Sequence, residues 1–213
     1  RLLKKVVKPI FKSQKVSNTL GKVISDQELK QLRIAETEKF AHVTYFFNGG
    51  DEKEFNGEDR VLVPSPRVKT YDLQPEMSAY EMTDIVIKKI KSQIYDFILI
   101  NYANTDMVGH SGQMEATIKA VETLDKCANK LLNVSKDENY TLILTSDHGN
   151  ADCMIDDLLM PCTTHTTNQV PFIICTKESI KLNDGSLADI SPTVLDLMGI
   201  KKKKEMTGRS LIK

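Results

Sequence analysis

Runs of apolar residues alternate with longer amphipathic stretches along the chain, and this alternation predicts strands interleaved with helices. The runs at residues 97–100, 140–145 and 170–175 contain no charged side chain, which is typical of buried strands. A shorter strand is expected at residues 60–63, because Pro64 stops the run.

Helical spacing of apolar residues is clearest at residues 78–92 and 113–134. Two earlier helices are also predicted. One is opened by the capping-box pattern of residues 25–28, and the other runs over about residues 37–48. The core-facing positions expected for the long helix are Ala116, Val121, Leu124, Ala128, Leu131 and Leu132.

Strands that alternate with helices predict an α/β fold around a mostly parallel sheet. A chain of 213 residues is long enough for one domain with a substantial core. The basic stretch at residues 1–15 shows little periodicity and is expected to be a linker.

Charge and cysteine usage narrow the classes of partner. The chain has 29 basic and 29 acidic residues, so no global field favours nucleic acid or an anionic membrane. No apolar run approaches the length of a membrane span. The four cysteines lack metal-finger spacing and are expected to be free thiols in a reducing compartment, which indicates a cytoplasmic protein. A thiolate ligand from Cys153 or Cys162 is the lesser alternative.

Metal-binding side chains gather where the predicted strands end or begin. Asp106 and His110 follow the first apolar strand, Asp147 and His148 follow the second, and His165 precedes the third. Ligands collect beyond the carboxyl ends of strands in open α/β sheets, so these side chains are expected to converge. Carboxylate and imidazole ligands suit manganese, zinc or a similar divalent ion. Two such ions could clamp a phosphate group during its transfer.

Several motifs resemble those of the cofactor-independent phosphoglycerate mutases. They comprise residues 31–50, 64–66, 71–80, 101–112, 145–150 and 164–167, and the resemblance runs from about Asn18 to Gly208. It implies an alkaline-phosphatase-like three-layer sandwich. Residues 18–213 would form the C-terminal part of its metal-binding domain, and residues 1–17 would be a basic linker from an inserted domain. The fold would be incomplete, because the N-terminal part is missing from this chain.

The resemblance also implies roles for particular residues. Asp106, His110 and His165 would hold one Mn²⁺ ion, and Asp147 and His148 the second. Lys39 would act in catalysis and substrate binding beside the transferring phosphate. The nucleophilic serine of the family has no counterpart here, so the fragment alone is expected to be inactive.

For the intact enzyme the resemblance implies interconversion of 3-phosphoglycerate and 2-phosphoglycerate through a phosphoserine intermediate in glycolysis. The enzyme would need no 2,3-bisphosphoglycerate and would act as a monomer, without nucleic acid or membrane partners. Two alternatives stay open. One is a metal-dependent phosphatase or phosphodiesterase of the same superfamily, and the other is a metal-binding fragment without activity.

Overall fold

The structure, a computed structural model, describes residue 10 and residues 16–213. The linker predicted at the N-terminus therefore lies almost entirely outside the described residues. The strands are β1 (Gln31–Glu36), β2 (Glu58–Val63), β3 (Phe97–Asn101), β4 (Leu142–Thr145) and β5 (Phe172–Cys175). The helices are α1 (Leu20–Asp26), α2 (Phe40–Val43), α3 (Ala79–Lys91), α4 (Asn104–Gly109), α5 (Met114–Asp137) and α6 (Ile190–Leu197). Short 3₁₀ helices cover Thr37–Lys39, Tyr71–Leu73 and Leu187–Asp189.

The strands form two sheets. The larger sheet has the order β2-β1-β3 and is parallel throughout, with Gln31 of β1 opposite both Glu58 and Phe97. The smaller sheet pairs β4 with β5 in antiparallel orientation. The predicted parallel sheet is therefore confirmed for β1 to β3, while the last two strands form a separate antiparallel pair.

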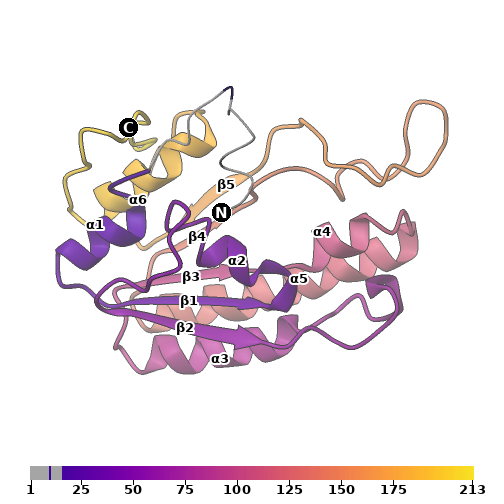
Figure 1. Cartoon of the computed structure of the whole chain (residues 1–213), viewed down its shortest axis with the longest axis horizontal. Coiled ribbons are helices and arrows are strands. Elements are labelled where there is room, and N and C mark those ends of the chain that lie inside the picture. The colour runs from indigo at the N-terminus through magenta and orange to yellow at the C-terminus, as the bar shows by residue number, and fades with distance from the viewer. Residues whose placement is uncertain (1–9, 11–15) are drawn as a thin grey trace.

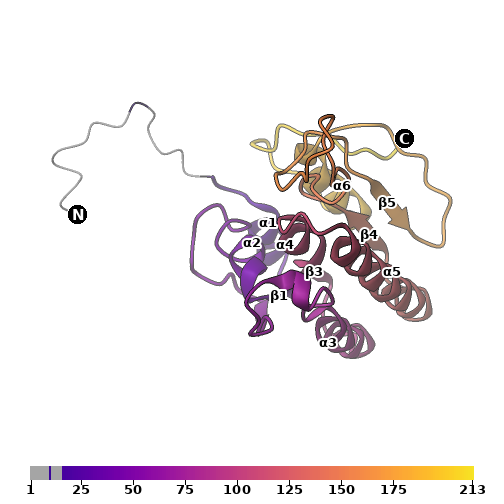
Figure 2. The same ribbon diagram turned by 90° about the vertical axis from the view of Figure 1, so that its right-hand side faces the viewer.

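Helices cover the strands from two sides, which gives the three layers that were expected (Figures 1 and 2). On one side, α3 and α5 pack against Ile34 of β1 and Val63 of β2. On the other, α1 and α6 pack together with Phe97 and Ile143 at the margin of their cluster. Within the described residues, no helix is both long and apolar enough to span a bilayer.

The central strand β1 is the main element that the sequence pattern failed to predict. The capping-box pattern of residues 25–28 does not open a helix; Ser25 lies near the end of α1, which begins at Leu20. All six residues of β1 are buried, including Arg33 and Glu36. Polar side chains such as these are typical of a surface segment, although this strand lies at the centre of the sheet.

Other predicted elements differ in extent or burial. The helix expected from Thr37 to about Asn48 is a 3₁₀ turn followed by the short α2. The helices at 78–92 and 113–134 are confirmed as α3 and α5, but Val121 of α5 is 47% exposed and is not a core residue. All five residues of β3 are half-buried, not fully enclosed, because β3 pairs with β1 alone among the strands that the structure describes.

Candidate metal centre

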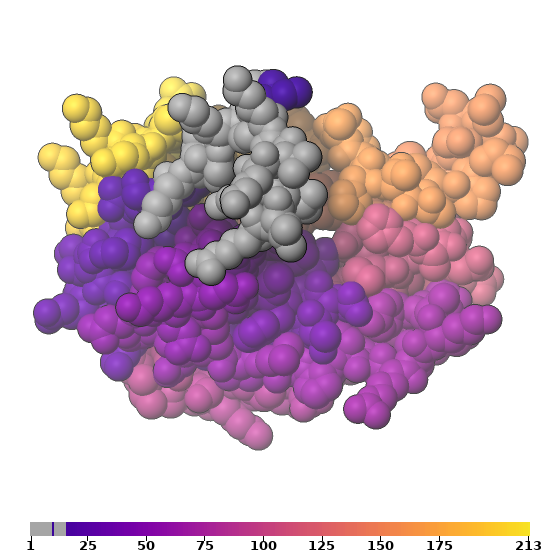
Figure 3. Space-filling model, in the orientation of Figure 1, coloured from indigo at the N-terminus to yellow at the C-terminus, as the bar shows by residue number. Residues whose placement is uncertain are grey.

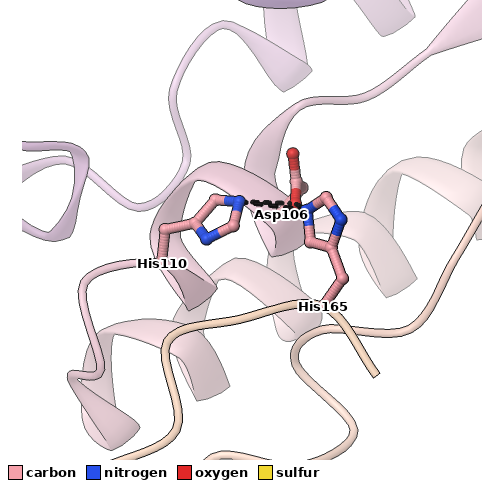
Figure 4. A group of neighbouring side chains, drawn as sticks. All are labelled: Asp106, His110 and His165. Carbon is pink, nitrogen blue, oxygen red and sulfur yellow. Dashed lines mark hydrogen bonds and ion pairs between the residues drawn. The ribbon is translucent and has the colours of Figure 1, made fainter. Parts of the chain in front are cut away.

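Three segments bring the predicted ligands to one end of the strands. Asp106 lies in the first turn of α4, which follows β3 almost directly, and His110 follows the last residue of that helix. His165 comes from the loop that precedes β5. Figure 4 shows these three side chains pointing toward one another. The expected convergence from separate parts of the sequence is therefore present for this group.

The ligand atoms of this group are close enough to share one ion. Asp106 Oδ1 lies 3.0 Å from His165 Nε2 and 3.1 Å from His110 Nε2. The two imidazole Nε2 atoms are 3.2 Å apart. Zinc and similar ions bind nitrogen and oxygen at about 2.0–2.2 Å. Ligand atoms bound to one such ion are therefore slightly farther apart than the 3.0, 3.1 and 3.2 Å found here. The group fits a divalent ion after an outward shift of a few tenths of an ångström.

Lys39, which precedes all of these ligands in sequence, contacts the same group. Its side chain is buried at the end of the 3₁₀ turn after β1, and its Nζ forms an ion pair with Asp106 Oδ2. Asn150 Nδ2 donates to Asp106 Oδ1 at 2.9 Å. Burial alone would raise the pKa of Asp106, but the hydrogen bonds from Lys39 and Asn150 and the charges of Lys39 and His110 lower it to about 2. Asp106 is therefore ionised and ready to bind a cation.

The second predicted pair lies against the first group. His148 Nε2 is 3.6 Å from Asp147 Oδ1, so both side chains turn to the same side although they are neighbours in sequence. The His148 ring stacks on the His165 ring with 3.7 Å between centroids. Within the described residues, however, Asp106, His110 and His165 form the single group of three or more ligands; Asp147 and His148 supply two.

Gly149 fixes the loop that carries His165. Its carbonyl accepts from Thr166 N at 2.9 Å, so the two segments run side by side. A Cβ atom at Gly149 would overlap Thr166 Oγ1 and would stand 2.7 Å from Asp152 Oδ1. Asp152 in turn accepts from Thr166 Oγ1 at 2.9 Å and from Asn168 Nδ2 at 2.6 Å. These contacts hold the residues that directly follow His165.

Sequence reasoning missed three residues around the centre. Asn150 holds Asp106, Asp152 clamps the His165 loop, and His42 lies near both ligand pairs. The pKa of His42 is lowered by burial and by the charge of Lys39, and the opposing charges of Asp147 and Asp106 only partly cancel this shift. For Asn150 and Asp152, the available hint was their position two and four residues after His148. Neither Cys153 nor Cys162 belongs to the ligand group.

Comparison with known proteins defines the class of this chain. The sequence pattern of the Metalloenzyme superfamily matches residues 10–202, and the chain belongs to this superfamily. Its alkaline-phosphatase-like fold is thereby confirmed. A 2-O GAG sulfatase, BT1596, shares the fold over 90% of this chain and 55% of its own, with a TM-score of 0.57 at 14% identity.

The relatives with higher sequence identity to this chain are all phosphoglycerate mutases by name. The 2,3-bisphosphoglycerate-independent phosphoglycerate mutase of Ehrlichia ruminantium (strain Gardel) is 58% identical over 205 residues, which are 95% of this chain and 41% of the relative. The protein of the same name from Wolbachia pipientis wMel is 56% identical, over 95% of this chain and 40% of the relative. A crystal structure of Leishmania mexicana phosphoglycerate mutase, determined at low cobalt concentration, is 32% identical with a TM-score of 0.83. It covers 89% of this chain and 38% of that protein.

These comparisons confirm the resemblance that the sequence motifs indicated. The matched region is the C-terminal part of the mutases. The chain spans about two-fifths of the length of the curated relatives it matches.

Proposed function

We propose that this chain is the metal-binding part of a 2,3-bisphosphoglycerate-independent phosphoglycerate mutase, which interconverts 3-phosphoglycerate and 2-phosphoglycerate. The observation that carries the proposal is the ion pair of Lys39 with Asp106, a carboxylate that also belongs to the ligand group with His110 and His165. A buried ammonium group beside a metal-ligand carboxylate suits a site that receives a phosphate. The names of the similar proteins support the same reaction.

In the proposed site, Asp106, His110 and His165 hold one Mn²⁺ ion, and Asp147 and His148 contribute to a second. When bound, the ions would neutralise phosphate charge and lower the pKa of a coordinated hydroxyl group. Asn150 and the ion pair with Lys39 keep Asp106 in position and ionised. Because imidazoles must be deprotonated to bind metal, we expect ion affinity to fall as the pH drops below neutral.

Lys39 has a further role in the proposed reaction. Its buried Nζ is fixed by Asp106, so the charge stays in one place. A phosphoryl group bound at the ions would lie near this fixed positive charge. The charge would stabilise the negative charge that develops during transfer. A serine outside the 213 residues would take the phosphoryl group and return it to the other hydroxyl of glycerate. We further propose that the intact enzyme is a cytoplasmic monomer that requires no 2,3-bisphosphoglycerate.

The experiment on the intact enzyme measures two products from 3-phosphoglycerate in the presence of Mn²⁺. We expect formation of 2-phosphoglycerate without release of free phosphate, and loss of this activity when Lys39 is changed to Met. Release of free phosphate as the main product would instead establish the phosphatase alternative. Isomerisation that requires added 2,3-bisphosphoglycerate would contradict the proposal.

For the isolated chain we propose metal binding without turnover. The second ligand pair is incomplete by itself, and the chain covers two-fifths of its relatives. Calorimetric titration with Mn²⁺ should show one tight site, which His165→Gln removes. Asp125→Asn is a matched surface control, because Asp125 lies exposed on α5. Turnover of 3-phosphoglycerate by this chain alone would refute this part.

A further inference from the structure

Residues 154–162 form a narrow hairpin beside the metal centre. Ile155 forms a bridge with Pro161, and the hairpin is attached at its base to a predicted ligand, because Thr163 O lies 2.8 Å from His110 Nδ1. Figure 3 shows this segment as an orange projection at the upper right, and Figure 1 shows it extending past α4. The hairpin therefore projects from the same end of the strands as the metal ligands.

Four large apolar side chains lie exposed at the tip of the hairpin. The exposed fractions are 50% for Ile155, 81% for Leu158, 84% for Leu159 and 59% for Met160. Elsewhere in the part of the chain that the structure describes, no three large apolar side chains in a row are exposed. Apolar patches of this kind are typical of surfaces that bind another protein surface or a membrane.

Asp156 fixes the shape of the tip. Its Oδ1 accepts from Leu158 N at 2.9 Å and from Met160 N at 2.8 Å, and its own N–H donates to Met160 O at 2.9 Å. Leu159 has a φ of 60°, which is uncommon for a residue other than glycine. A residue stays in such a conformation only where the surrounding structure holds it there. The tip is therefore a preformed surface, and its docking requires little further ordering of the backbone.

Charge argues against a membrane as the partner of this tip. The tip carries Asp156 and Asp157, and the chain has no lysine or arginine between Lys136 and Lys177. Anionic membrane surfaces attract clusters of lysine and arginine, and they repel aspartate. A complementary partner would instead offer an apolar recess with basic side chains at its border.

The size of the tip argues against a second copy of this chain. Stable interfaces between separate proteins involve about 20–30 residues on each side, whereas the tip comprises only residues 155–160. Two tips in contact would also bring the aspartates of both copies together, which is unfavourable. A contact of this size is sufficient within one polypeptide, because the two surfaces are already held at a high effective concentration.

We propose that the tip docks into an apolar recess with a basic border on the part of the parent mutase that lies outside these 213 residues. The chain spans about two-fifths of its curated relatives, so most of a parent of that length lies outside it. The inference rests on the proposed function, in which that outer part carries the nucleophilic serine and must reach the metal centre. The hairpin projects beside this centre, so its docking would hold the two parts together around the phosphate site.

The test compares the oxidation of Met160 by hydrogen peroxide in the intact mutase and in the isolated chain, measured by peptide mass spectrometry. We expect oxidation to be slower in the intact mutase by about tenfold or more, since burial of one large apolar side chain contributes at least a factor of this order. Leu158→Ser combined with Leu159→Ser should return the rate to within about twofold of that in the isolated chain. Leu62→Ser, which changes an exposed leucine of β2, should leave the protection in place.

Equal oxidation rates in the intact mutase and the isolated chain, with both folded by circular dichroism, would overturn the proposal. Protection that appears only at high protein concentration would indicate a second copy. Binding to phosphatidylserine vesicles that the double serine variant abolishes would indicate a membrane. Either result would also overturn it.

The product assay separates this proposal from the proposed function. Formation of 2-phosphoglycerate by an intact mutase in which Met160 is unprotected would refute the docking and leave the reaction standing. Release of free phosphate by an intact enzyme in which Met160 is protected would refute the reaction and leave the docking standing.

Discussion

Replacement of Asp106 by Asn tests whether the metal centre is assembled before any ion binds. In the folded chain this carboxylate contacts Lys39, Asn150, His110 and His165, which come from four separate segments. Asn keeps the shape of the side chain but removes its charge. The substitution therefore removes the interactions that favour an ionised group at this position and little else.

The size of the effect follows from the pKa of Asp106, which is lowered from 3.8 to about 2. At about 1.36 kcal/mol per unit, this shift corresponds to roughly 2.4 kcal/mol of stability. Because the side chain keeps 13% exposure to solvent, we reduce the expectation to about 2 kcal/mol. A lowered pKa stabilises the fold above the pKa of the unfolded chain. This contribution is lost as the pH falls from about 4 toward about 2.

The assay is urea unfolding followed by circular dichroism in the presence of a chelator. At pH 7 the free energy of unfolding of Asp106→Asn should be lower by about 2 kcal/mol, and the difference should shrink below about pH 4. Asp125→Asn, on the exposed face of α5, should change little. Addition of Mn²⁺ at a hundredfold excess over its Kd should add about 2.7 kcal/mol to the original chain only. Equal stability of the two proteins without metal would refute the reasoning.

Three further substitutions test other parts of the fold and the site. Arg33 is fully buried against Phe47, and burial lowers its pKa to about 10. This shift means that keeping the guanidinium charged lowers the free energy of unfolding by about 3 kcal/mol. Arg33→Met removes this buried charge but also removes its cation–π contact, which contributes about 2 kcal/mol. The free energy of unfolding in urea titrations should therefore rise by about 1 kcal/mol, and a clear decrease in it would contradict this reasoning. Burial raises the pKa of Glu36, so its charge destabilises the fold once the pH exceeds the pKa of the unfolded chain. Glu36→Gln should therefore stabilise the chain at pH 8 and lose this advantage near pH 4, and a gain that is independent of pH would exclude the explanation. Gly149→Ala places a methyl group on Thr166, so it should cost about 1–3 kcal/mol and weaken Mn²⁺ binding in calorimetry; unchanged affinity would argue against the clamp.

The candidate site was more predictable from the sequence than the centre of the fold. Asp and His side chains in combination near strand ends suit a divalent ion. His165 reaches this end of the strands because β5, which it precedes, runs antiparallel to β4. Asp106, His110 and His165 accordingly meet as the positions suggested. The support from Asn150 and Asp152 was not predictable, because hydrogen bonds between distant segments leave no periodic pattern.

Two elements show why burial was harder to infer. Arg33 and Glu36 in β1 are fully buried with partners that only the tertiary structure supplies. In α5, Thr117 and Thr123 are buried while Val121 is exposed. The hydroxyl groups of these threonines donate to the carbonyls of Gln113 and Lys119, four residues earlier, at 2.9 and 2.8 Å. Once their polar atoms are satisfied locally, they can face the core as readily as an aliphatic side chain.

The pairing of β1 has a consequence for how the molecule forms. Gln31 is matched with Glu58, 27 positions later, and with Phe97, 66 positions later. Lys39 reaches Asp106 across a similar span of 67 positions. Contacts so distant in sequence close large loops, which slows folding. On the ribosome, β1 can pair with β2 first, and its pairing with β3 must wait until β3 has emerged. Lys39 and Asp106 can likewise form their ion pair only after the residues that follow β3 have emerged, so the site forms after the first strands have paired.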